Sequence, residues 1–373
     1  MGLRASNTIL LSANSSWYLF NFRRNLIRKL LGLGWIVVVV VPDEKYASPL
    51  LSIGCKAFFV AMDNRGTNPI RDFLTQIRYL ILYRQLRPSC VLHFTIKPVV
   101  YGSFAARTLG VPTINTITGL GSAFLGGPFI QNSVSWLLRR ALVASRFVVF
   151  QNRIDSQLFA SKKLVTTEQI VHTFGSGVDL GYFSFHSYPT EGGDRLTLIA
   201  RMLRDKGVEE FVACAKRSHE EGLGVEYTLV GPLESPAVGG IPEADIKNWV
   251  NAGFIDYIEK QDDIRPWITQ STCVVLPSYR EGMARILMEA CAMGRPVITT
   301  NVPGCSDIVD SNKNGFLCEA RDASSLFEAI ARFTCLPRSE KIQMGYRAHE
   351  IAHERFSDLR INEIYISLIQ RLC

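Results

Sequence analysis

Two short apolar runs, separated by a longer amphipathic stretch, follow one another between residues 273 and 300. The runs are CVVL at residues 273–276 and VITT at residues 297–300, and both have the composition of buried strands. The stretch between them contains a loop and a segment with helical periodicity. This order predicts a strand, a loop, a helix and a second strand, which is the repeating unit of a parallel α/β sheet.

Two glutamates of this unit point to chemistry. Glu281 stands at the expected entrance of the helix, and Glu289 follows eight residues later. On a helix this spacing is about 12 Å along the axis and about 80° around it, so both carboxylates lie on nearly one face. That separation suits the two hydroxyl-bearing ends of a nucleotide sugar. In the alternative interpretation Glu281 only caps the helix and Glu289 is solvated, but the apolar neighbours of Glu289 favour the functional one.

The backbone between the glutamates is a candidate phosphate site. If the helix begins near Glu281, then Gly282, Met283 and Ala284 form its first turn. Amide N–H groups of a first turn have no partner within the helix and attract anions. We therefore expect these three amides to contact a diphosphate.

Arg201 and Lys206 are candidates for the same diphosphate. They follow the strand expected at residues 196–200 and stand five positions apart. Two cations in such a loop can converge on one diphosphate, the arginine through its planar fork and the lysine as a point charge. The alternative is that they form salt bridges with Glu209 or Glu210.

The unit described first resembles the E-x7-E signature of the retaining GT-B glycosyltransferases of family 4. Further motifs of that family occur in the same order over residues 195–320: ARMLRDKG at 200–207, VGP at 230–232, GFI at 253–255, VPGC at 302–305 and NGFL at 314–317. The resemblance implies an α/β protein with the GT-B fold, two Rossmann-like domains facing across a cleft. It implies that Arg201 and Lys206 hold the donor diphosphate, that Glu281 contacts the transferred sugar and that Glu289 binds the ribose. We also expect Ile255 to present its backbone to the base.

The N-terminal half resembles, more loosely, the members of that family that act on polyprenyl-diphosphate-linked sugars. The matching stretches are HFTIKP at residues 93–98, Tyr101 with Gly102, and NTITGLG at residues 115–121. The first loop departs from the pattern, because many members have a Gly-Gly turn where this chain has SANSSW at residues 12–17. The subgroup adds N-acetylhexosamines or hexoses, including the first N-acetylgalactosamine of bacterial N-glycans, and it also serves O-antigen assembly.

Residues that follow the expected strands of this half are candidates for the acceptor site and the catalytic site. Ligands of parallel α/β sheets bind beyond the carboxyl ends of the strands. The resemblance implies that His93 approaches the donor sugar and Lys97 a phosphate, although a lone histidine at a strand end is more often structural. The residues expected to bind the acceptor are Asn14, Ser15, Lys97, Thr118 and Gly119.

The 373 residues suffice for two domains with full cores. We expect an acceptor-binding domain at residues 1–180, a linker at 181–194, a nucleotide-sugar-binding domain at 195–350, and a C-terminal helix at 351–373 that packs back toward the first domain. The linker is predicted from low periodicity and from a change in charge.

Charge is unevenly distributed along the chain. Residues 1–180 contain 20 Lys and Arg against 7 Asp and Glu, whereas the remainder contains 21 against 27. Arginines recur on two expected helices, residues 17–31, with Arg23 and Arg24, and residues 68–87. A basic domain without nucleic-acid motifs favours an anionic membrane surface or a diphosphate-bearing acceptor as partner. The alternative is an ordinary basic domain whose charges face water.

Several classes of protein are disfavoured. No apolar run approaches the roughly 20 residues that span a bilayer, and no signal peptide is evident, so we expect a cytoplasmic protein that is peripheral to the inner face of the plasma membrane. The nine cysteines form no C-x-x-C pair, which argues against a zinc site or a disulfide framework. No D-x-D triplet offers a metal-diphosphate site, so we expect no metal and no cofactor beyond a UDP-sugar substrate. Nucleic-acid binding lacks any standard motif.

These observations predict a retaining glycosyltransferase, a hexosyltransferase that moves a hexose or an N-acetylhexosamine from a UDP-sugar to a polyprenyl-diphosphate-linked saccharide in surface glycan assembly. N-acetylgalactosamine is the first candidate. Two other interpretations stay open: a nucleotide-sugar epimerase of the same fold, and a non-catalytic scaffold that binds a nucleotide sugar. The sequence does not indicate the linkage or the oligomeric state.

Overall fold

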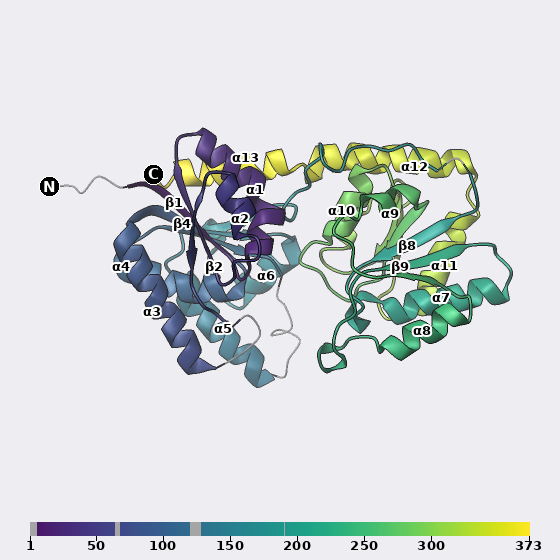
Figure 1. Cartoon of the computed structure of the whole chain (residues 1–373), viewed down its shortest axis with the longest axis horizontal. Helices are drawn as coiled ribbons and strands as arrows, with labels where there is room; N and C mark the ends of the chain where they lie inside the picture. Colours follow the sequence, from purple (N-terminus) through teal and green to yellow (C-terminus); the bar gives the residue numbers. More distant parts are fainter. Residues whose placement is uncertain (1–5, 64–67, 120–127, 190) are drawn as a thin grey trace. The chain divides into compact units, whose positions relative to one another are not determined.

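The computed structural model describes residues 6–119, except 64–67, and residues 128–373, except 190. The chain folds into two compact units (Figure 1). Unit 1 consists of Met1–Ser176 together with Asp358–Cys373, and unit 2 consists of Gly177–Ser357. Each unit has its own parallel sheet with helices on both faces, the arrangement of a Rossmann-like domain.

The sheet of unit 1 has seven parallel strands in the order β3-β2-β1-β4-β5-β6-β7. The strands are β1 (Ser6–Ser12), β2 (Ile36–Val41), β3 (Lys56–Phe59), β4 (Pro88–Phe94), β5 (Thr113–Ile117), β6 (Phe147–Phe150) and β7 (Ile170–His172). The helices are α1 (Ser16–Gly32), α2 (Ala47–Ser52), α3 (Pro69–Leu86), α4 (Ser103–Leu109), α5 (Pro128–Leu142), α6 (Arg153–Ser161) and α13 (Asp358–Gln370).

Both faces of this sheet are buried, which explains why its strands are almost continuously apolar. On β1, Ile9 and Leu11 pack in one cluster with α1 and α13, whereas Leu10 packs in another with α3 and α4. Figure 1 shows α1, α2 and α13 over one face and α3, α4 and α5 over the other. The alternation follows from the two-residue period of a strand.

The sheet of unit 2 has six parallel strands in the order β10-β9-β8-β11-β12-β13. The strands are β8 (Arg195–Ile199), β9 (Glu226–Val230), β10 (Asp256–Ile258), β11 (Cys273–Leu276), β12 (Val297–Thr300) and β13 (Gly315–Cys318). The helices are α7 (Val208–Glu220), α8 (Glu243–Asn251), α9 (Arg265–Gln270), α10 (Arg285–Ala292), α11 (Ala323–Thr334) and α12 (Arg338–Ile351).

In both sheets the direction of winding reverses beside the central first strand. The reversal lies between β1 and β4 in unit 1 and between β8 and β11 in unit 2. At such a switch point the loops leave two neighbouring strands in opposite directions, so the carboxyl ends of the strands open a space for a ligand. These two places are therefore the candidate binding sites of the two units.

The boundary between the units differs from the predicted one. It falls between Ser176 and Gly177, and residues 181–194, predicted as a linker, belong to unit 2. The buried side chain of Arg295 explains this, because its guanidinium donates hydrogen bonds to the carbonyls of His186 (2.8 Å) and Ser187 (2.9 Å) as well as to Ile268 and Thr269. Lys341 also pairs with Asp194 at 2.6 Å. The chain returns from unit 2 to unit 1 at Asp358, whereas the sequence predicts that the returning segment starts at residue 351.

Arg23 on α1 corrects part of the prediction for this helix, in which its arginines contact an anionic membrane or an acceptor diphosphate, or face water. Its side chain is only 1% exposed, and its guanidinium carbon lies 4.5 Å from the centre of the Phe94 ring and 5.0 Å from that of Tyr365. Cation–π contacts of this kind join α1 to β4 and α13 inside unit 1. Arg23 is thus part of the core and does not face a membrane or an acceptor.

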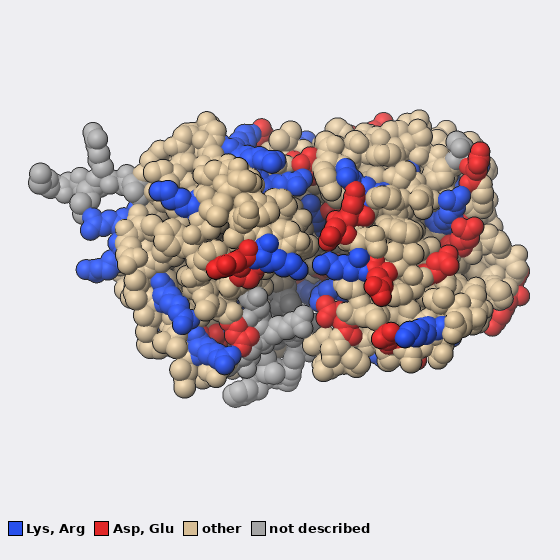
Figure 2. All heavy atoms as spheres, in the orientation of Figure 1, with Lys and Arg blue, Asp and Glu red and all other residues tan. Residues whose placement is uncertain are grey.

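Charge over the surface follows the pattern of the sequence. On the face shown in Figure 2, Lys and Arg side chains spread over unit 1, whereas Asp and Glu side chains gather mainly on unit 2. Within the described ranges, no helix combines the length and the apolar character needed to cross a membrane.

The Arg295 hydrogen bonds lead to a stability prediction. We expect Arg295→Met to lower the free energy of unfolding of unit 2 by about 3 kcal/mol, because several buried carbonyls lose their donor while the side-chain volume is kept. Urea denaturation followed by fluorescence measures this. Arg347→Met is the control, since Arg347 is 65% exposed in its pair with Glu350 and should change the stability by less than about 1 kcal/mol. Equal effects of the two variants would contradict the assignment.

Candidate active site

The loops at the switch point of unit 2 bring Lys206 and Glu281 together. Lys206 comes from the turn after β8 and Glu281 from the loop after β11, and the ammonium lies 2.5 Å from Oε1 of Glu281. Ser278 donates a hydrogen bond to the same oxygen at 2.9 Å. Both charged side chains are less than one-fifth exposed. A largely buried ion pair at the carboxyl edge of the sheet is therefore the centre of this site.

Two close backbone approaches hold these loops in place. Gly207 has φ +73°, and a Cβ there would lie 2.2 Å from the carbonyl oxygen of Pro277, at the end of β11. A Cβ on Gly304, after β12, would lie 2.5 Å from the carbonyl oxygen of Glu281. Only glycine permits contacts this close. The loops after β8, β11 and β12 are therefore packed backbone against backbone around Glu281.

The start of α10 corrects the predicted phosphate site. The helix begins at Arg285, so Glu281 lies in the preceding loop and the helical spacing to Glu289 does not apply. The amide of Ala284 donates a hydrogen bond to the carbonyl of Gly304 at 2.7 Å, and Met283 has a buried side chain. Gly282 lies in the same loop. The amide of Ala284 is thus engaged by the chain itself, and these three residues do not form the first turn of a helix.

Glu289 is buried and paired, contrary to the interpretation of a solvated glutamate. It lies on α10 with 6% of its surface exposed, and Nε of Arg285 donates a hydrogen bond to its Oε1 at 2.5 Å. Burial raises the pKa of its carboxyl, although the guanidinium of Arg285 acts in the opposite direction. A buried carboxylate with one cation beside it is suited to accept hydrogen bonds from hydroxyl groups.

Arg201 lies beside the same edge but is more open. Its side chain is 51% exposed and its guanidinium pairs with Glu234 at 3.3 Å. The predicted alternative partners have other contacts, since Glu209 pairs with Arg204 and Glu210 accepts a hydrogen bond from Tyr279. An exposed arginine can turn toward a ligand at little energetic cost, because surface ion pairs are weak.

Ile255 is not brought to this group. Its side chain is buried in the core of unit 2, and it directly precedes β10. It therefore stands at the amino end of that strand, whereas the site is made by loops that leave carboxyl ends. The loop that leaves the carboxyl end of β10, on the side of the site, starts after Ile258.

In unit 1, the predicted acceptor residues border the carboxyl edge of the sheet. The backbone amide of Asn14, after β1, donates a hydrogen bond to the hydroxyl of Thr95, after β4, at 3.1 Å. Ser15 caps α1 by accepting from the amide of Tyr18. Thr118 and Gly119 follow β5 and are half-buried, and the rest of the predicted glycine turn, Leu120 and Gly121, lies outside the described residues.

Two predicted ligands of unit 1 have internal partners. His93 is completely buried; Nε2 lies 2.8 Å from the hydroxyl of Tyr83 and Nδ1 lies 2.7 Å from Oδ1 of Asn115. Burial lowers the pKa of His93 to about 4, so its ring is neutral and enclosed, and the structure argues against a catalytic contact. Lys97 forms an ion pair with Asp72 at 2.6 Å, with both side chains largely buried. It holds α3 in place instead of offering a free charge.

Some residues of these loops escaped the sequence analysis. Ser278 and Arg285 bind the two glutamates, and Glu234 binds Arg201. Spacing could have revealed only Arg285, since it stands four positions before Glu289 on one helix. Thr95 has φ +70°, a strained conformation for a β-branched residue, and such strain is concentrated at functional loops. Over the described ranges, no cluster of three or more His, Cys, Asp and Glu side chains is placed to hold a metal ion.

Comparison with known proteins agrees with this geometry. The family model described as glycosyl transferases group 1 matches residues 193–334, and the model described as glycosyl transferase 4-like matches residues 8–152. The two matches fall in units 2 and 1, respectively. The chain belongs to the glycosyltransferases.

Individual relatives of this glycosyltransferase are distant but of nearly equal length. The chain is 23% identical to the N,N'-diacetylbacillosaminyl-diphospho-undecaprenol α-1,3-N-acetylgalactosaminyltransferase of Campylobacter jejuni, over 95% of this chain and 96% of that protein. It is 24% identical to the UDP-Gal:α-D-GlcNAc-diphosphoundecaprenol α-1,3-galactosyltransferase of Escherichia coli, over 78% of each.

Solved structures confirm the fold of this glycosyltransferase. A glycosyltransferase from Rickettsia africae superposes with a TM-score of 0.81 over 98% of both chains, at 17% identity. HepE of Anabaena in complex with UDP-glucose superposes with a TM-score of 0.77 over 98% of this chain and 99% of that one, at 15% identity. The α/β architecture of two Rossmann-like units is the predicted GT-B fold.

The enclosed ring of His93 predicts a pH-dependent stability. Its pKa in the folded protein, about 4, lies below the ordinary histidine value of 6.5, so the unfolded chain binds a proton first as the pH falls. The stabilisation is complete above pH 6.5 and is lost toward pH 4, by up to about 1.4 kcal/mol per pH unit. We expect the free energy of unfolding, measured with urea at several pH values in this range, to change less steeply with pH for His93→Gln than for the unaltered protein.

The control for this measurement is His219→Gln, which changes an exposed histidine of α7. It should keep the slope of the unaltered protein. If His93→Gln also kept that slope, the buried, neutral state of His93 would be wrong.

Proposed function

We propose that this glycosyltransferase transfers a hexose or an N-acetylhexosamine, with N-acetylgalactosamine as the first candidate, from a UDP-sugar to a polyprenyl-diphosphate-linked saccharide in surface glycan assembly. The Lys206–Glu281 pair at the switch point of unit 2 is the observation that carries the proposal. The acceptors named for the Campylobacter and Escherichia enzymes support the acceptor class, and the UDP-glucose bound by HepE supports the donor class.

The donor would bind at the carboxyl edge of unit 2. Lys206 has three N–H donors and uses one for Glu281, so it can also bind a phosphate oxygen. Arg201, half-exposed, can leave Glu234 for the bidentate geometry that phosphate favours. Together they would hold the diphosphate in the way the sequence predicts.

Glu281 and Glu289 would bind the two sugars of the donor. Among the described residues, Lys206 and Ser278 both bind Oε1 of Glu281, which leaves Oε2 for a hydroxyl of the transferred sugar. Glu289, held by Arg285, would accept hydrogen bonds from the ribose. Because the Lys206 pair and the loop glycines fix the position of Glu281, it can orient the sugar without a large loss of entropy.

We propose transfer with retention, by front-face substitution. The bond from the anomeric carbon to the β-phosphate oxygen breaks, and the acceptor oxygen bonds to that carbon on the same face. The acceptor proton passes to the departing β-phosphate oxygen. Lys206 and Arg201 would stabilise the negative charge that develops there. His93 has no part in this step, because its ring is enclosed.

The acceptor would meet the loops at the carboxyl edge of unit 1. Asn14, Ser15, Thr118 and Gly119 border this edge, and the hydrogen bond from Asn14 to Thr95 joins the loops on both sides of the switch point. Neutral side chains and backbone groups of this kind suit the hydroxyl groups of a saccharide.

The function is tested with purified protein, a panel of UDP-hexoses and UDP-N-acetylhexosamines, and polyprenyl-diphosphate-linked mono- and disaccharides, followed by mass spectrometry. We expect one sugar to be added only when the lipid-linked acceptor is present. Lys206→Met should lower kcat/KM about 100-fold with little change in Tm. Lys247→Met, which removes an exposed lysine paired with Glu243 on α8, is the matched control and should keep full activity.

Two outcomes would contradict the proposal. Conversion of the donor to its epimer without any acceptor would indicate an epimerase. Full activity of Lys206→Met would show that the Lys206–Glu281 ion pair is not part of the active site. The configuration of the product, read by NMR, decides whether transfer retains the anomeric configuration.

A polyprenyl-linked acceptor lies in a membrane, and α3 is suited to contact one. Its outer face exposes Ile70 (71%), Phe73 (60%), Leu74 (43%) and Ile81 (52%). Arginines occur along and just after the same helix, at positions 71, 78, 84 and 87, whereas the acidic Asp72 faces inward to Lys97. Apolar side chains beside cations match the interface of an anionic bilayer. We propose that α3 docks on such a membrane.

Vesicle sedimentation tests the role of α3. We expect the protein to bind vesicles that contain phosphatidylglycerol and not vesicles of phosphatidylcholine alone, and Leu74→Ser combined with Phe73→Ser to weaken binding at least tenfold, because buried apolar area is lost. The control is Leu223→Ser in unit 2, where the leucine is also 43% exposed. Equal binding by all variants would rule out α3 as the contact.

A further inference from the structure

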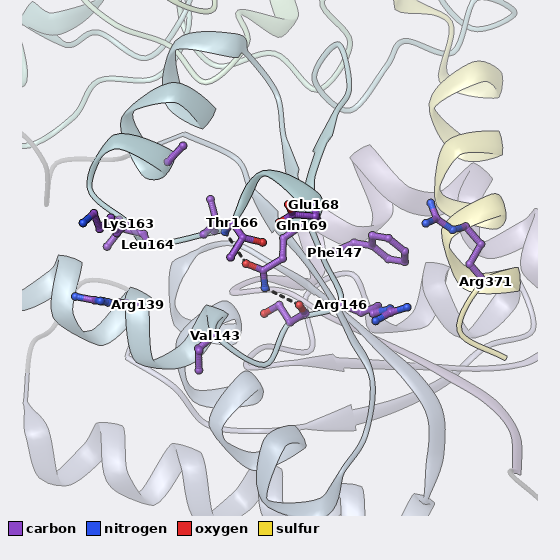
Figure 3. Close-up of a pocket in the computed structure, with 13 residues that line it drawn as sticks. Arg139, Val143, Arg146, Phe147, Lys163, Leu164, Thr166, Glu168, Gln169 and Arg371 are labelled. Atoms are coloured by element: carbon purple, nitrogen blue, oxygen red, sulfur yellow. Dashed lines mark hydrogen bonds between the residues drawn. The ribbon is translucent and has the colours of Figure 1, made fainter.

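A second basic site lies at the amino edge of the unit 1 sheet, away from the loops discussed so far. A cavity of about 760 Å³ is lined by the end of α5, the start of β6, the segment after α6 and the end of the chain beyond α13 (Figure 3). Arg146 directly precedes β6 and Gln169 directly precedes β7. Because the candidate acceptor loops follow the strands, the two sites are at opposite edges of one sheet.

The lining of this cavity carries four cations and one carboxylate. The cations are Arg139, Arg146, Lys163 and Arg371, and the carboxylate is Glu168. Within the described part of the chain, none of the four basic side chains forms a hydrogen bond or an ion pair. Hydrogen bonding to Thr166 lowers the pKa of Glu168, so this carboxylate stays charged and still leaves an excess of positive charge.

These cations are not needed to cap the helix that ends here. Nε2 of Gln169 donates hydrogen bonds to the carbonyls of Leu142 (2.9 Å) and Ser145 (2.7 Å), at and just after the end of α5. Oε1 of the same side chain accepts from the amide of Thr166 at 2.9 Å. Gln169 thus satisfies the terminal carbonyls and fixes the loop, and Arg139 and Arg146 are left without that role.

Exposed basic side chains stand on two sides of the cavity. Figure 3 shows Arg139 and Lys163 on one side of Gln169 and Arg146 and Arg371 on the other. The guanidinium of Arg371 stacks on the ring of Phe147, 4.6 Å from its centre, which holds the plane while the N–H edge stays open. Stacked arginines keep their donors for planar, bidentate contacts with phosphate.

We propose that this cavity binds a phosphate-bearing anion at a site distinct from the donor and acceptor loops. The chemistry is that of a phosphate or diphosphate group, held by Arg146 and Arg371 on one side and by Arg139 and Lys163 on the other. This group can belong to a free metabolite or to the headgroup of an anionic lipid. The experiments below distinguish these two sources.

Titration with inorganic diphosphate, followed by calorimetry at low salt, tests the free ligand. Arg146→Gln combined with Arg371→Gln should weaken this component of binding by roughly tenfold or more, since two charge-assisted contacts are lost. Arg107→Gln, an exposed arginine at the end of α4, is the control for a change in net charge alone. Turnover of the donor should stay unchanged in both variants, which separates this site from the one in unit 2.

Hydrogen exchange locates the binding. Diphosphate should protect the amides of residues 163–171 in the unaltered protein and not in the double variant. A parallel arm uses vesicles with and without phosphatidylglycerol: loss of vesicle binding in the double variant, with diphosphate inert, assigns the site to a lipid headgroup. If neither ligand protects these residues, or if Arg107→Gln weakens binding as much as the double variant, the proposal is wrong.

Discussion

The candidate site of this glycosyltransferase depends on how closely the loops of unit 2 approach one another at its switch point. Gly207 lets the turn after β8 touch the backbone of Pro277, and Gly304 lets the loop after β12 touch that of Glu281. Without these contacts Lys206 and Glu281 would be two flexible surface side chains, and an exposed ion pair has little effect. Packing fixes the backbone, and the largely buried pair thereby acquires a defined geometry, as our proposal for the binding of a phosphate and a sugar requires.

Unit 1 uses its polar residues differently at the corresponding edge. A buried hydrogen-bond network joins His93 to Asn115 and Tyr83. The charge of Lys97 is neutralised by its ion pair with Asp72. These groups hold β4, β5 and α3 together beneath the loops, so the residues left at the surface are small and neutral. The contrast fits a division of labour in which unit 2 supplies charge for a diphosphate and unit 1 supplies hydrogen-bonding surface for a saccharide. The positive charge of unit 1 lies instead on the outside of α3 and around the cavity at the amino edge of its sheet.

The sequence predicts most strands and helices well, and it predicts that Lys206 and Glu281 stand in loops that follow strands, because apolar runs, glycines and motif spacing are local signals. What it misses depends on partners distant in sequence. The histidine of HFTIKP gives no sign that Tyr83 and Asn115 enclose it, and the helix after Glu281 starts late because Gly304 takes the amide of Ala284. The segment 181–194 has the composition of a linker, but Arg295, more than a hundred positions later, binds two of its carbonyls and makes it part of unit 2.

The role of a buried charged residue depends on the groups that surround its charge. Arg23, Arg295 and Glu289 are all nearly inaccessible, yet they have different roles: Arg23 stacks between aromatic rings, Arg295 satisfies carbonyls, and Glu289 keeps a cation beside it. The charges of Arg23 and Arg295 are stabilised by aromatic rings and by backbone carbonyls, respectively. Burial disfavours the charged form in two of these three residues: it raises the pKa of the Glu289 carboxyl and lowers that of the Arg295 guanidinium to about 10, so the pKa shifts alone do not separate their roles. What distinguishes Glu289 is its partner, a single arginine on the same helix, and this is why our proposal gives Glu289 to the ligand whereas the two arginines bind groups of the fold.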